Sequence, residues 1–310
     1  MNQITDTILM IRPAAYRMNE QTAVNNYFMQ ETPLSDEEVT VRAQAEFDAF
    51  VKKLRAVGVK VIVVEDIKEQ DTPDSIFPNN WVSFHQSGNV GIYPMFAENR
   101  RRERREDILK KIEEEGYVIN NIVDYSSAED DGKFLEATGS LILDRQNRKA
   151  YCALSPRADE DLVIEFCEDF EYMPVIFRAY QNVDGQRKEI YHTNVMMGLG
   201  EELAIICSDS IDDSKERKMV IKSLKADGKV IVKLTEEQMH HFAGNMLEVR
   251  GAFNKKYMVM SQAAYEALTK DQIQLIEQYS EILYADIHTI EKLGGGSVRC
   301  MMAEIFLPKA

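Results

Sequence analysis

The chain has 310 residues, 45% of them hydrophobic, and a formal net charge of −15. Its size allows a sizeable core in one large domain or two small ones, and its acidity argues against a nucleic-acid partner, whose phosphates would be repelled. No stretch approaches the roughly 20 apolar residues of a membrane span, and the first residues lack the basic and apolar regions of a secretion signal. We therefore expect a cytoplasmic protein with reduced cysteines.

The predicted elements recur in one order along the chain. A strand over 7–14 is followed by a helix over 35–58, with a capping box at Ser35 and Glu38 and a stop at Gly58, and then by a buried strand. Each later unit has two strands around a turn, a helix and a third strand. The strand pairs are predicted at 75–95, 133–155, 189–210 and 241–262. The helices that follow them are predicted at 101–116, 156–170, 211–228 and 263–280, and the third strands at 117–125, 173–180, 229–234 and 281–287.

The units repeat with a period of about 55 residues, which is typical of a repeat architecture. Residues 295–309 resemble the start of one more unit without a helix. We predict a closed ring in which 295–309 complete the unit that 7–14 begin, because closure covers edge strands. No linker rich in proline, glycine or serine divides the chain, so 1–310 are predicted to form a single domain. The alternative is an ordinary α/β sandwich with coincidental spacing.

The residues with the most distinctive chemistry fall at one position in successive units, at the predicted end of the first strand. Asn80, Glu136, His192, Asn245 and Cys300 are separated by 56, 56, 53 and 55 residues. In a ring of such units, equivalent positions converge around the axis. We therefore expect a thiol, an imidazole, a carboxylate and carboxamides to meet in one central cavity.

This set of groups is typical of nucleophilic catalysis. A thiolate is the reactive form of cysteine, and a nearby imidazolium favours it. His192 can transfer a proton to a leaving amine, and Glu136 can fix the tautomer of the imidazole. A lone cysteine, histidine or glutamate is more often structural. Cys152 and Cys207, in apolar strand-like runs, and Cys167, in an acidic helix, are interpreted in that structural way.

Four segments resemble motifs of one known superfamily. "GGGSVRCM" at 294–301 resembles its C-terminal glycine-rich motif with the nucleophilic cysteine, "YHTN" at 191–194 its His-x-Asp motif, and "EATGS" at 136–140 its Glu-x-x-Gly segment. "PDSIFPNNW" at 73–81 resembles the Pro-Asp-x-x-Phe-x-x-Asp segment of dimethylarginine dimethylaminohydrolases and arginine deiminases. The superfamily is that of the amidinotransferases and deiminases, the guanidine-modifying penteins. The resemblance implies the α/β fold class, as a pentein α/β-propeller of five ββαβ-type modules around a pseudo-fivefold axis.

The resemblance further implies a cysteine-dependent hydrolase without a metal or another cofactor. Cys300 is then the nucleophile that attacks the central carbon of a guanidino or ureido group to form a covalent thio intermediate. His192 protonates the departing nitrogen and then activates water, and Glu136 orients the histidine. The expected partner is a small molecule, a citrulline-like or arginine-like amino acid.

The same resemblance provides candidates for binding the amino-acid end of the substrate. Arg100 and Arg157 are candidates for the α-carboxylate, because a planar guanidinium fork suits a carboxylate. Asp74 is the candidate for the α-ammonium group. The other arginines that follow Arg100 are predicted to lie in solvent, paired with Glu103 and Glu106.

Two asparagines depart from the motifs. Members of the superfamily that act on arginine hold its cation with aspartates at the positions of Asn80 and Asn194. A buried carboxylate beside a neutral urea is an uncompensated charge, whereas a carboxamide offers both a donor and an acceptor. Together with Asn79, these residues predict a ureido substrate, with citrulline as the leading candidate, cleaved to ornithine, CO2 and ammonia. The alternative is that these asparagines cap turns at strand ends.

Several other functions stay open at this point. Within the superfamily they are arginine deiminase, dimethylarginine dimethylaminohydrolase and amidinotransferase activity. In other classes they are a non-catalytic amino-acid-binding pentein and an α/β scaffold protein whose register is accidental. The sequence does not decide whether water or a second amine is the final acceptor, nor how many subunits assemble.

Overall fold

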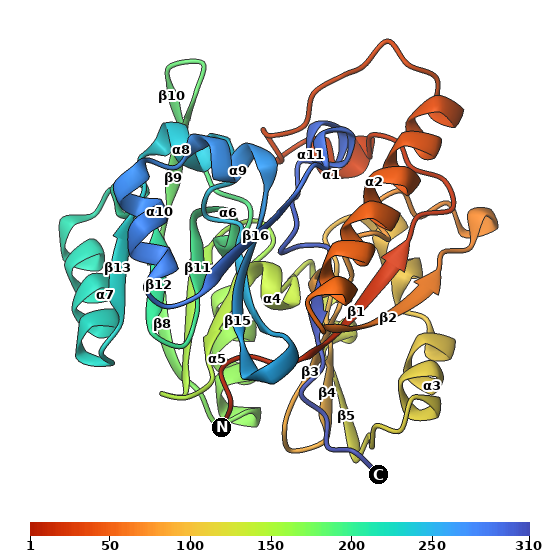
Figure 1. The fold of residues 1–310 in the computed structure, drawn as a ribbon, viewed down its shortest axis with the longest axis horizontal. Coiled ribbons are helices and arrows are strands. Elements are labelled where there is room, and N and C mark those ends of the chain that lie inside the picture. The colour runs from red at the N-terminus through yellow and green to blue at the C-terminus, as the bar shows by residue number, and fades with distance from the viewer.

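The computed structural model describes residues 1–310, and its strands form five three-stranded sheets and one two-stranded hairpin (Figure 1). In each three-stranded sheet the first strand runs antiparallel to the second, and the second runs parallel to the third. Parallel neighbours require a crossover, and helices supply it in every sheet. The chain therefore has a mixed α/β fold, as the sequence predicts.

The five sheets are β17–β1–β2 (Ala303–Glu304, Thr7–Arg12, Lys60–Glu65), β3–β4–β5 (Val82–Phe84, Asn89–Ile92, Asn121–Asp124), β6–β7–β8 (Leu141–Asp144, Lys149–Leu154, Met173–Arg178), β11–β12–β13 (Met197–Leu199, Leu203–Ile206, Val230–Lys233) and β14–β15–β16 (Leu247–Arg250, Lys256–Ser261, Glu281–Ala285). The hairpin is β9–β10 (Tyr180–Val183, Gln186–Glu189).

The crossover helices are α2 (Asp36–Ala56), α3 (Glu106–Glu114), α5 (Glu160–Asp169), α7 (Ser214–Ala226) and the pair α9 (Gln262–Ala267) and α10 (Lys270–Glu277). The shorter helices are α1 (Glu20–Ala23), α4 (Ala137–Ser140), α6 (Thr193–Met196), α8 (Glu236–His240) and α11 (His288–Gly294). Turns of 3-10 helix lie at Lys68–Gln70, Pro78–Asn80, Glu98–Glu103, Ser126–Asp131, Ser208–Ser210 and Ala252–Asn254.

The two ends of the chain share one sheet. β17 pairs antiparallel with β1, so that Glu304 lies opposite Ile8 and Ala303 opposite Leu9. The hydroxyl of Thr5 also donates a hydrogen bond to the carbonyl oxygen of Ile305, at 2.6 Å. This pairing confirms that the last strand completes the unit begun by the first, and it covers one edge of β1.

Helix α2 has the ends that the sequence predicts. The backbone N–H of Ser35 donates to the Glu38 carboxylate at 2.9 Å, and the backbone N–H of Glu38 donates to the Ser35 hydroxyl at 3.3 Å. The helix ends before Gly58, which has a φ of +89°. That conformation favours glycine, and the backbone of Ala252 approaches it closely, so Gly58 is a true stop.

The structure differs from the predicted helices in two of the crossovers. The single helix predicted over 263–280 is two helices, because Leu268 is extended and Thr269 begins a new capping box with Gln272. The helix predicted over 101–116 begins instead as a 3-10 turn, and α3 starts only at Glu106. Apolar residues continue across the first interruption, which explains why periodicity hides it, whereas residues 101–105 are all charged and carry no apolar period.

The hairpin β9–β10 is absent from the predicted elements. Its strands are joined by Asp184 and Gly185, whose φ angles are 50° and 77°. Two successive residues in the left-handed region are typical of the tight turn that an Asp-Gly pair favours. This dipeptide was therefore a readable local signal for the hairpin.

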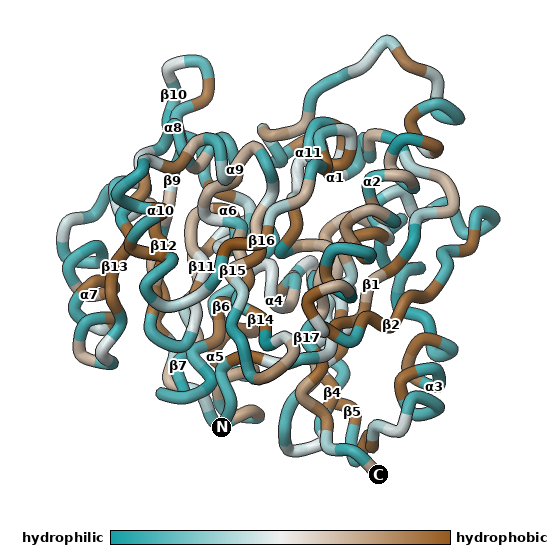
Figure 2. The backbone as a smooth tube through the Cα atoms, in the orientation of Figure 1, coloured by the Kyte–Doolittle hydropathy of each residue, from teal (hydrophilic) through white to brown (hydrophobic).

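Apolar side chains are concentrated in the strands. Figure 2 shows hydrophobic stretches along the strands and mixed colouring along the peripheral helices α3 and α7. The largest buried apolar cluster contains 32 residues, and a second cluster of 25 includes Cys300. No helix combines the length and the apolar content that crossing a bilayer requires.

Candidate active site

The five residues in repeat register lie just before the first strand of their sheets rather than at its end. Asn80 ends the 3-10 turn before β3, and Glu136 and His192 immediately precede the short helices α4 and α6. Asn245 precedes β14, and Cys300 precedes β17. The predicted strand ends were wrong because short turns, which apolar patterning does not distinguish from strands, occupy these segments.

Glu136 and His192 are in direct contact. Oε2 of Glu136 lies 2.7 Å from Nε2 of His192, and both side chains are buried. The other carboxylate oxygen accepts a hydrogen bond from the backbone N–H of Phe96 at 3.1 Å. Because a carboxylate only accepts, this network assigns the imidazole proton to Nε2 and leaves Nδ1 as the acceptor. Glu136 thus sets the tautomer of His192.

The charges around this pair keep the carboxylate ionised and the imidazole neutral. Burial raises the pKa of Glu136, but the Arg157 charge and the hydrogen bond to His192 outweigh it and lower the pKa to about 2. Burial lowers the pKa of His192 to about 4, against the opposing influence of Glu136. A neutral imidazole at pH 7 has the protonation state of a general base.

Cys300 is held by two carboxamides. The Nδ2 groups of Asn194 and Asn245 each donate a hydrogen bond to its Sγ, both at 3.3 Å. The Oδ1 of Asn245 accepts from the backbone N–H of Arg299 at 2.9 Å, which fixes the orientation of that amide. Two amide donors fix the position of this sulfur. The repeat register predicted Asn245 at the central cavity, but no role in catalysis or substrate binding was predicted for it.

The other three cysteines are in different surroundings. Burial raises the pKa of the Cys167 thiol to about 12 and raises the pKa of Cys207, against the hydrogen bond from Ser210. Burial also raises the pKa of Cys152 far above its ordinary value. Elevated pKa values disfavour thiolates, as the interpretation of these cysteines as inert predicts.

One small cavity collects most of the predicted site residues. Its lining contains Cys300, His192, Asn80, Asp74, Arg100 and Arg157, so sulfur and imidazole face the same space. Glu136 lies behind His192, and Asn194 reaches the cavity through its contact with Cys300. Asn79 is buried but is not part of the lining, so the structure does not bring this candidate to the cavity.

The cavity is covered by the segment around α1. Its volume is about 10 Å3, roughly the space of one water molecule, and Thr22 and Asn26 form part of its wall. The Asn26 amide donates to the carbonyl oxygens of Gly294 and Gly295 at 3.2 and 3.3 Å. An amino acid enters only if this segment moves. Sequence analysis missed these residues, because the segment belongs to no repeat and carries no apolar period.

The two arginines of the cavity are held by protein groups. Arg100 donates from Nε and Nη2 to Glu103, at 2.9 and 3.0 Å, and from Nη1 to Oδ1 of Asn80, at 2.8 Å. Burial lowers the pKa of Arg100, but Glu103 and Asp74 raise it beyond its ordinary value, so Arg100 stays charged. Arg157 donates from Nε to Oδ1 of Asn25 at 2.9 Å.

The predicted pairing of the remaining arginines with Glu103 and Glu106 is wrong, although Arg102 is exposed as predicted. Glu103 is buried and pairs with Arg100, not with an exposed neighbour. Arg101 and Arg104 instead pair with Glu129, which the 3-10 turn brings within reach.

Two buried polar atoms near the sulfur and arginines have no hydrogen-bond partner. They are Oδ1 of Asp74 and Oδ1 of Asn194. The other oxygen of Asp74 accepts from Nδ2 of Asn19 at 2.8 Å and from the hydroxyl of Thr22 at 3.1 Å. A buried acceptor without a partner is costly, and both atoms are therefore available to donors on a ligand.

One cluster of carboxylates could in principle hold a metal ion. The ligand atoms of Glu201, Glu202 and Glu248 lie within 4.8 Å of one another, outside the cavity. Lys256 lies 3.4 Å from Glu201, and Arg250 lies 3.1 Å from the same residue. Two cations of the protein, Arg250 and Lys256, therefore already offset much of the charge of these three carboxylates.

Gly139→Ala is expected to lower turnover about 100-fold by displacing the catalytic groups. A methyl group at this position would lie 2.4 Å from Nδ2 of Asn80 and 2.8 Å from Nδ1 of His192. Steady-state kinetics, with circular dichroism to confirm the fold, measure the effect. Gly116→Ala, where no atom lies within 4 Å, is the control and should retain full turnover at a small cost in stability.

The structure resembles solved structures of guanidine-modifying enzymes. ArgZ, an arginine dihydrolase from the ornithine-ammonia cycle in Cyanobacteria, superposes with a TM-score of 0.74 at 18% identity, covering 98% of this chain and 41% of that one. AgrE in complex with L-arginine gives 0.74 at 17% identity, covering 98% and 40%. This chain thus spans about two fifths of both proteins, and it covers 99% of the N-terminal domain of ArgZ at a TM-score of 0.73.

A dimethylarginine dimethylaminohydrolase bound to S-methyl-L-thiocitrulline superposes with a TM-score of 0.63 at 15% identity, covering 97% of this chain and 100% of that one. The search of curated protein sequences gives no match. The chain belongs to the pentein superfamily, the class of the amidinotransferases and arginine deiminases. Within it, the chain belongs to the eukaryotic N,N-dimethylarginine dimethylhydrolase family, whose model matches residues 12–307.

Proposed function

We propose that the protein is a cysteine hydrolase that cleaves a C–N bond of a ureido amino acid, with citrulline as the leading substrate. The orientation of one amide carries this proposal. Arg100 donates to Oδ1 of Asn80, so the NH2 group of Asn80 must point the other way. One hydrogen of that NH2 group is used by Oδ1 of Asn79, at 3.0 Å. The other has no partner in the protein, and Nδ2 of Asn80 and Nδ1 of His192 both lie beside Gly139.

A donor at this place discriminates between substrates. A guanidinium has only donors, so it would place N–H groups against the N–H of Asn80. A ureido group has a carbonyl oxygen, which accepts that hydrogen bond, and an NH2 group, which finds an acceptor in the free Oδ1 of Asn194. The neutral carboxamides therefore match a neutral ureido group on both sides, which favours citrulline over arginine.

The proposed reaction uses the groups of the cavity in two steps. Nδ1 of His192 takes the thiol proton of Cys300, and the thiolate attacks the ureido carbon. The bond from that carbon to the alkyl nitrogen then breaks, and His192 returns the proton to this nitrogen. Ornithine is released, and the carbamoyl group stays bound to the sulfur. His192 then takes a proton from water, whose oxygen attacks the carbamoyl carbon and displaces the thiolate. The carbamate released decays to CO2 and ammonia.

The segment over the cavity occupies the positions proposed for the amino-acid end of the substrate. Asp74 accepts from Asn19 and Thr22, and Arg157 donates to Asn25 and to the carbonyl oxygen of Thr22. We infer that the α-ammonium and α-carboxylate replace these contacts when the segment moves aside. We propose Arg157 as the partner of the α-carboxylate. Its present partner Asn25 is only half-buried, so the substrate can replace Asn25 more readily than a fully buried group.

Arg100 has a different proposed role from the one predicted. Its Nε and Nη2 are used by Glu103, and its Nη1 holds Asn80. We therefore propose Arg100 as a positioning residue that sets the Asn80 amide, rather than as a direct partner of the substrate carboxylate.

We also propose that the five sheets are the blades of one pentein propeller, formed by residues 1–310 as a single domain. Two observations support this. The sheets share one strand order, with the last strand of the chain completing the first sheet. Residues from separate units also meet directly, as in the contacts of Glu136 with His192 and of Asn245 with Cys300.

A second candidate is arginine dihydrolase activity, which the likeness to AgrE with bound L-arginine favours. Incubation of the protein with citrulline, arginine and dimethylarginine, with assays for ornithine, citrulline and ammonia, separates the functions. We expect one ornithine and one ammonia from each citrulline. Two ammonia for each ornithine from arginine would establish the second candidate. Accumulation of citrulline from arginine or dimethylarginine would overturn the proposal, and no turnover of any of them would leave a binding protein.

Asn80→Asp is expected to lower kcat/KM for citrulline about 100-fold and to raise it for arginine, because a carboxylate replaces the amide donor with acceptors. Kinetics with both substrates measure this change in preference. Asn120→Asp, the same chemical change on the surface, is the matched control and should leave both values unaltered. An unchanged citrulline-to-arginine ratio in Asn80→Asp would mean that Asn80 does not face the reactive group.

A further inference from the structure

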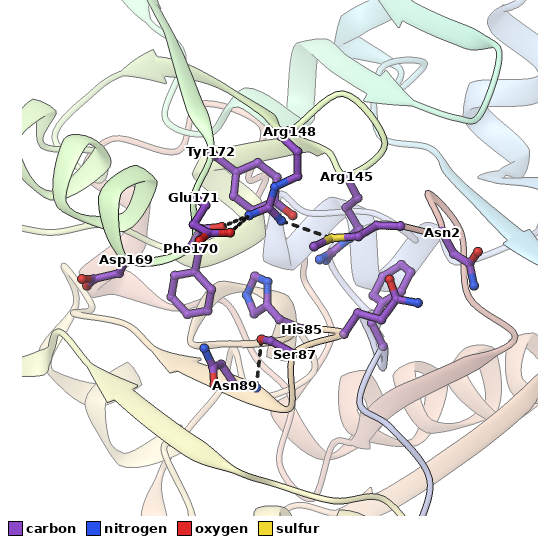
Figure 3. A pocket seen from close by; sticks show the side chains of 13 residues that line it. Asn2, His85, Ser87, Asn89, Arg145, Arg148, Asp169, Phe170, Glu171 and Tyr172 are labelled. Carbon is purple, nitrogen blue, oxygen red and sulfur yellow. Dashed lines mark hydrogen bonds and ion pairs between the residues drawn. The ribbon is translucent and has the colours of Figure 1, made fainter.

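A second pocket lies at the opposite ends of β3 and β6 from the catalytic groups. Asn80 and Glu136 precede these strands, whereas His85 and Arg145 follow them. The pocket has a volume of about 210 Å3 and is also lined by the segment after α5 and by Phe306. Figure 3 shows His85, Arg145, Arg148, Phe170 and Tyr172 gathered around this space, which we call the Arg145 pocket.

Arg145 carries a buried charge without a partner. Its side chain is 4% exposed, and its guanidinium makes no hydrogen bond or ion pair with the protein. Its one contact of note is with the ring of Phe306, whose centroid lies 4.0 Å from the guanidinium carbon. Glu304 borders the same side chain, but it is already paired with Arg299 at 2.7 Å. A guanidinium with so little exposure gains from an anion that reaches it through the pocket, because water replaces few of its missing partners.

The neighbouring charged side chains already have partners of their own. Arg148 donates to the Glu171 carboxylate at 3.3 Å, and its guanidinium lies over the ring of Tyr172 at 4.4 Å. The carboxylate of Asp169 accepts from the hydroxyl of Tyr125 at 2.8 Å. Arg145 is therefore the cation of this pocket that has no carboxylate of the protein within ion-pair distance, while Glu171 already pairs with Arg148.

His85 adds a neutral, planar wall. Its Nε2 lies 2.7 Å from the hydroxyl of Ser83, and its ring packs against Phe170 with the centroids 4.1 Å apart. Burial lowers the pKa of His85 well below its ordinary value, and the charges of Arg145 and Arg148 lower it further. The imidazole is therefore uncharged at pH 7 and adds an aromatic surface.

We propose that the Arg145 pocket binds a small monocarboxylate with an apolar or aromatic body. One guanidinium fork matches one carboxylate, and the rings of Phe170, Tyr172 and Phe306 supply apolar surface for the body. This site is separate from the catalytic cavity, and it does not depend on the reaction proposed there.

Calorimetric titration with benzoate, and with its neutral analogue benzamide, tests the proposal. We expect saturable binding of benzoate at least about tenfold tighter than that of benzamide, because only the carboxylate pairs with the guanidinium. Arg145→Met should lose this preference, whereas Arg178→Met, which removes an exposed arginine, should retain it. Without ligand, Arg145→Met should melt at or above the wild-type temperature, because an unpaired buried charge has been removed.

Three results would overturn the proposal: no benzoate binding by the wild type, equal binding by Arg145→Met, or a lower melting temperature of that variant without ligand. The first two place no anion at Arg145, and the third makes Arg145 a structural group. If Arg145→Met fails to fold, a crystal soaked with para-bromobenzoate decides. Bromine between Phe170 and Phe306 supports the site, and bromine only in the catalytic cavity refutes it.

Discussion

Cys300→Ser is expected to lower ornithine release at least about 10,000-fold while the fold stays intact. A serine hydroxyl is a far weaker nucleophile than a thiolate, because His192 must remove a proton that an alcohol holds much more tightly. The hydroxyl still accepts from Asn194 and Asn245, so the local packing survives. Turnover of citrulline and the melting temperature, measured on the same preparation, separate chemistry from stability.

Cys167→Ser is the matched control for this experiment. Cys167 lies in α5, away from the cavity, and its thiol is buried. We expect this variant to retain its turnover and to lose about 1–2 kcal/mol of stability, because a hydroxyl replaces an apolar group. Equal losses of turnover in the two serine variants would show that Cys300 has no special chemistry. Full activity of Cys300→Ser would remove the nucleophile from the proposed mechanism.

The repeat is the part of this structure that the sequence predicts best. Apolar runs, caps and turns are local signals, so the capping box of Ser35 and Glu38 can be read directly from the chain. The spacing of Asn80, His192 and Cys300 is periodic, so the cavity that they share could be anticipated without knowing any contact. Periodicity places residues in equivalent positions even where the strand boundaries are wrong.

The partners of Arg100 illustrate what the sequence does not predict, although its place at the site was predicted. Arg100 lies in a run of arginines that looks solvated, yet it is buried between Glu103 and Asn80. Its burial depends on contacts with a turn 20 residues earlier in the chain, and no local pattern marks them. The α1 segment is similar, because its contacts reach across more than 130 residues, to Arg157. Such contacts follow from the packing of modules against one another, not from the pattern within any one of them.

Glu136→Gln is expected to lower both turnover and stability, because the Glu136 carboxylate pairs with the charge of Arg157 and also holds the imidazole of His192. Its carboxylate lies 3.5 Å from Nη1 of Arg157, which has no other carboxylate within ion-pair distance, and 2.7 Å from Nε2 of His192. Removing one partner of a buried ion pair costs about 3–5 kcal/mol. Turnover should fall about 1,000-fold, since an amide neither favours the imidazolium nor fixes the tautomer as firmly. Denaturant unfolding and steady-state kinetics measure the two effects.

Glu291→Gln is the control for the loss of a buried carboxyl group. Burial raises the pKa of Glu291 to about 7, so it is partly neutral already, and its Oε1 accepts from the hydroxyl of Ser297 at 2.6 Å. An amide can keep that hydrogen bond. We expect a loss of only about 0.5–1.5 kcal/mol and little change in turnover. A similar loss of stability in both variants would mean that the negative charge of Glu136 adds nothing to the stability of the fold beyond the packing and hydrogen bonds of its side chain.

The dependence on pH separates the charge of Glu136 from its shape. Its folded pKa of about 2 lies below the ordinary 4.5, so the stability it contributes is present above pH 4.5 and is lost as the pH falls towards 2. The folded pKa of His192, about 4, lies below 6.5, so folding also weakens as the pH falls from 6.5 to 4. In Glu136→Gln the first loss should disappear. The acid limb of its remaining activity should move below pH 4, because the carboxylate that raises the pKa of His192 is gone. An acid limb that stays in place would show that another group controls the imidazole, and Glu136 would then be only a structural partner of Arg157.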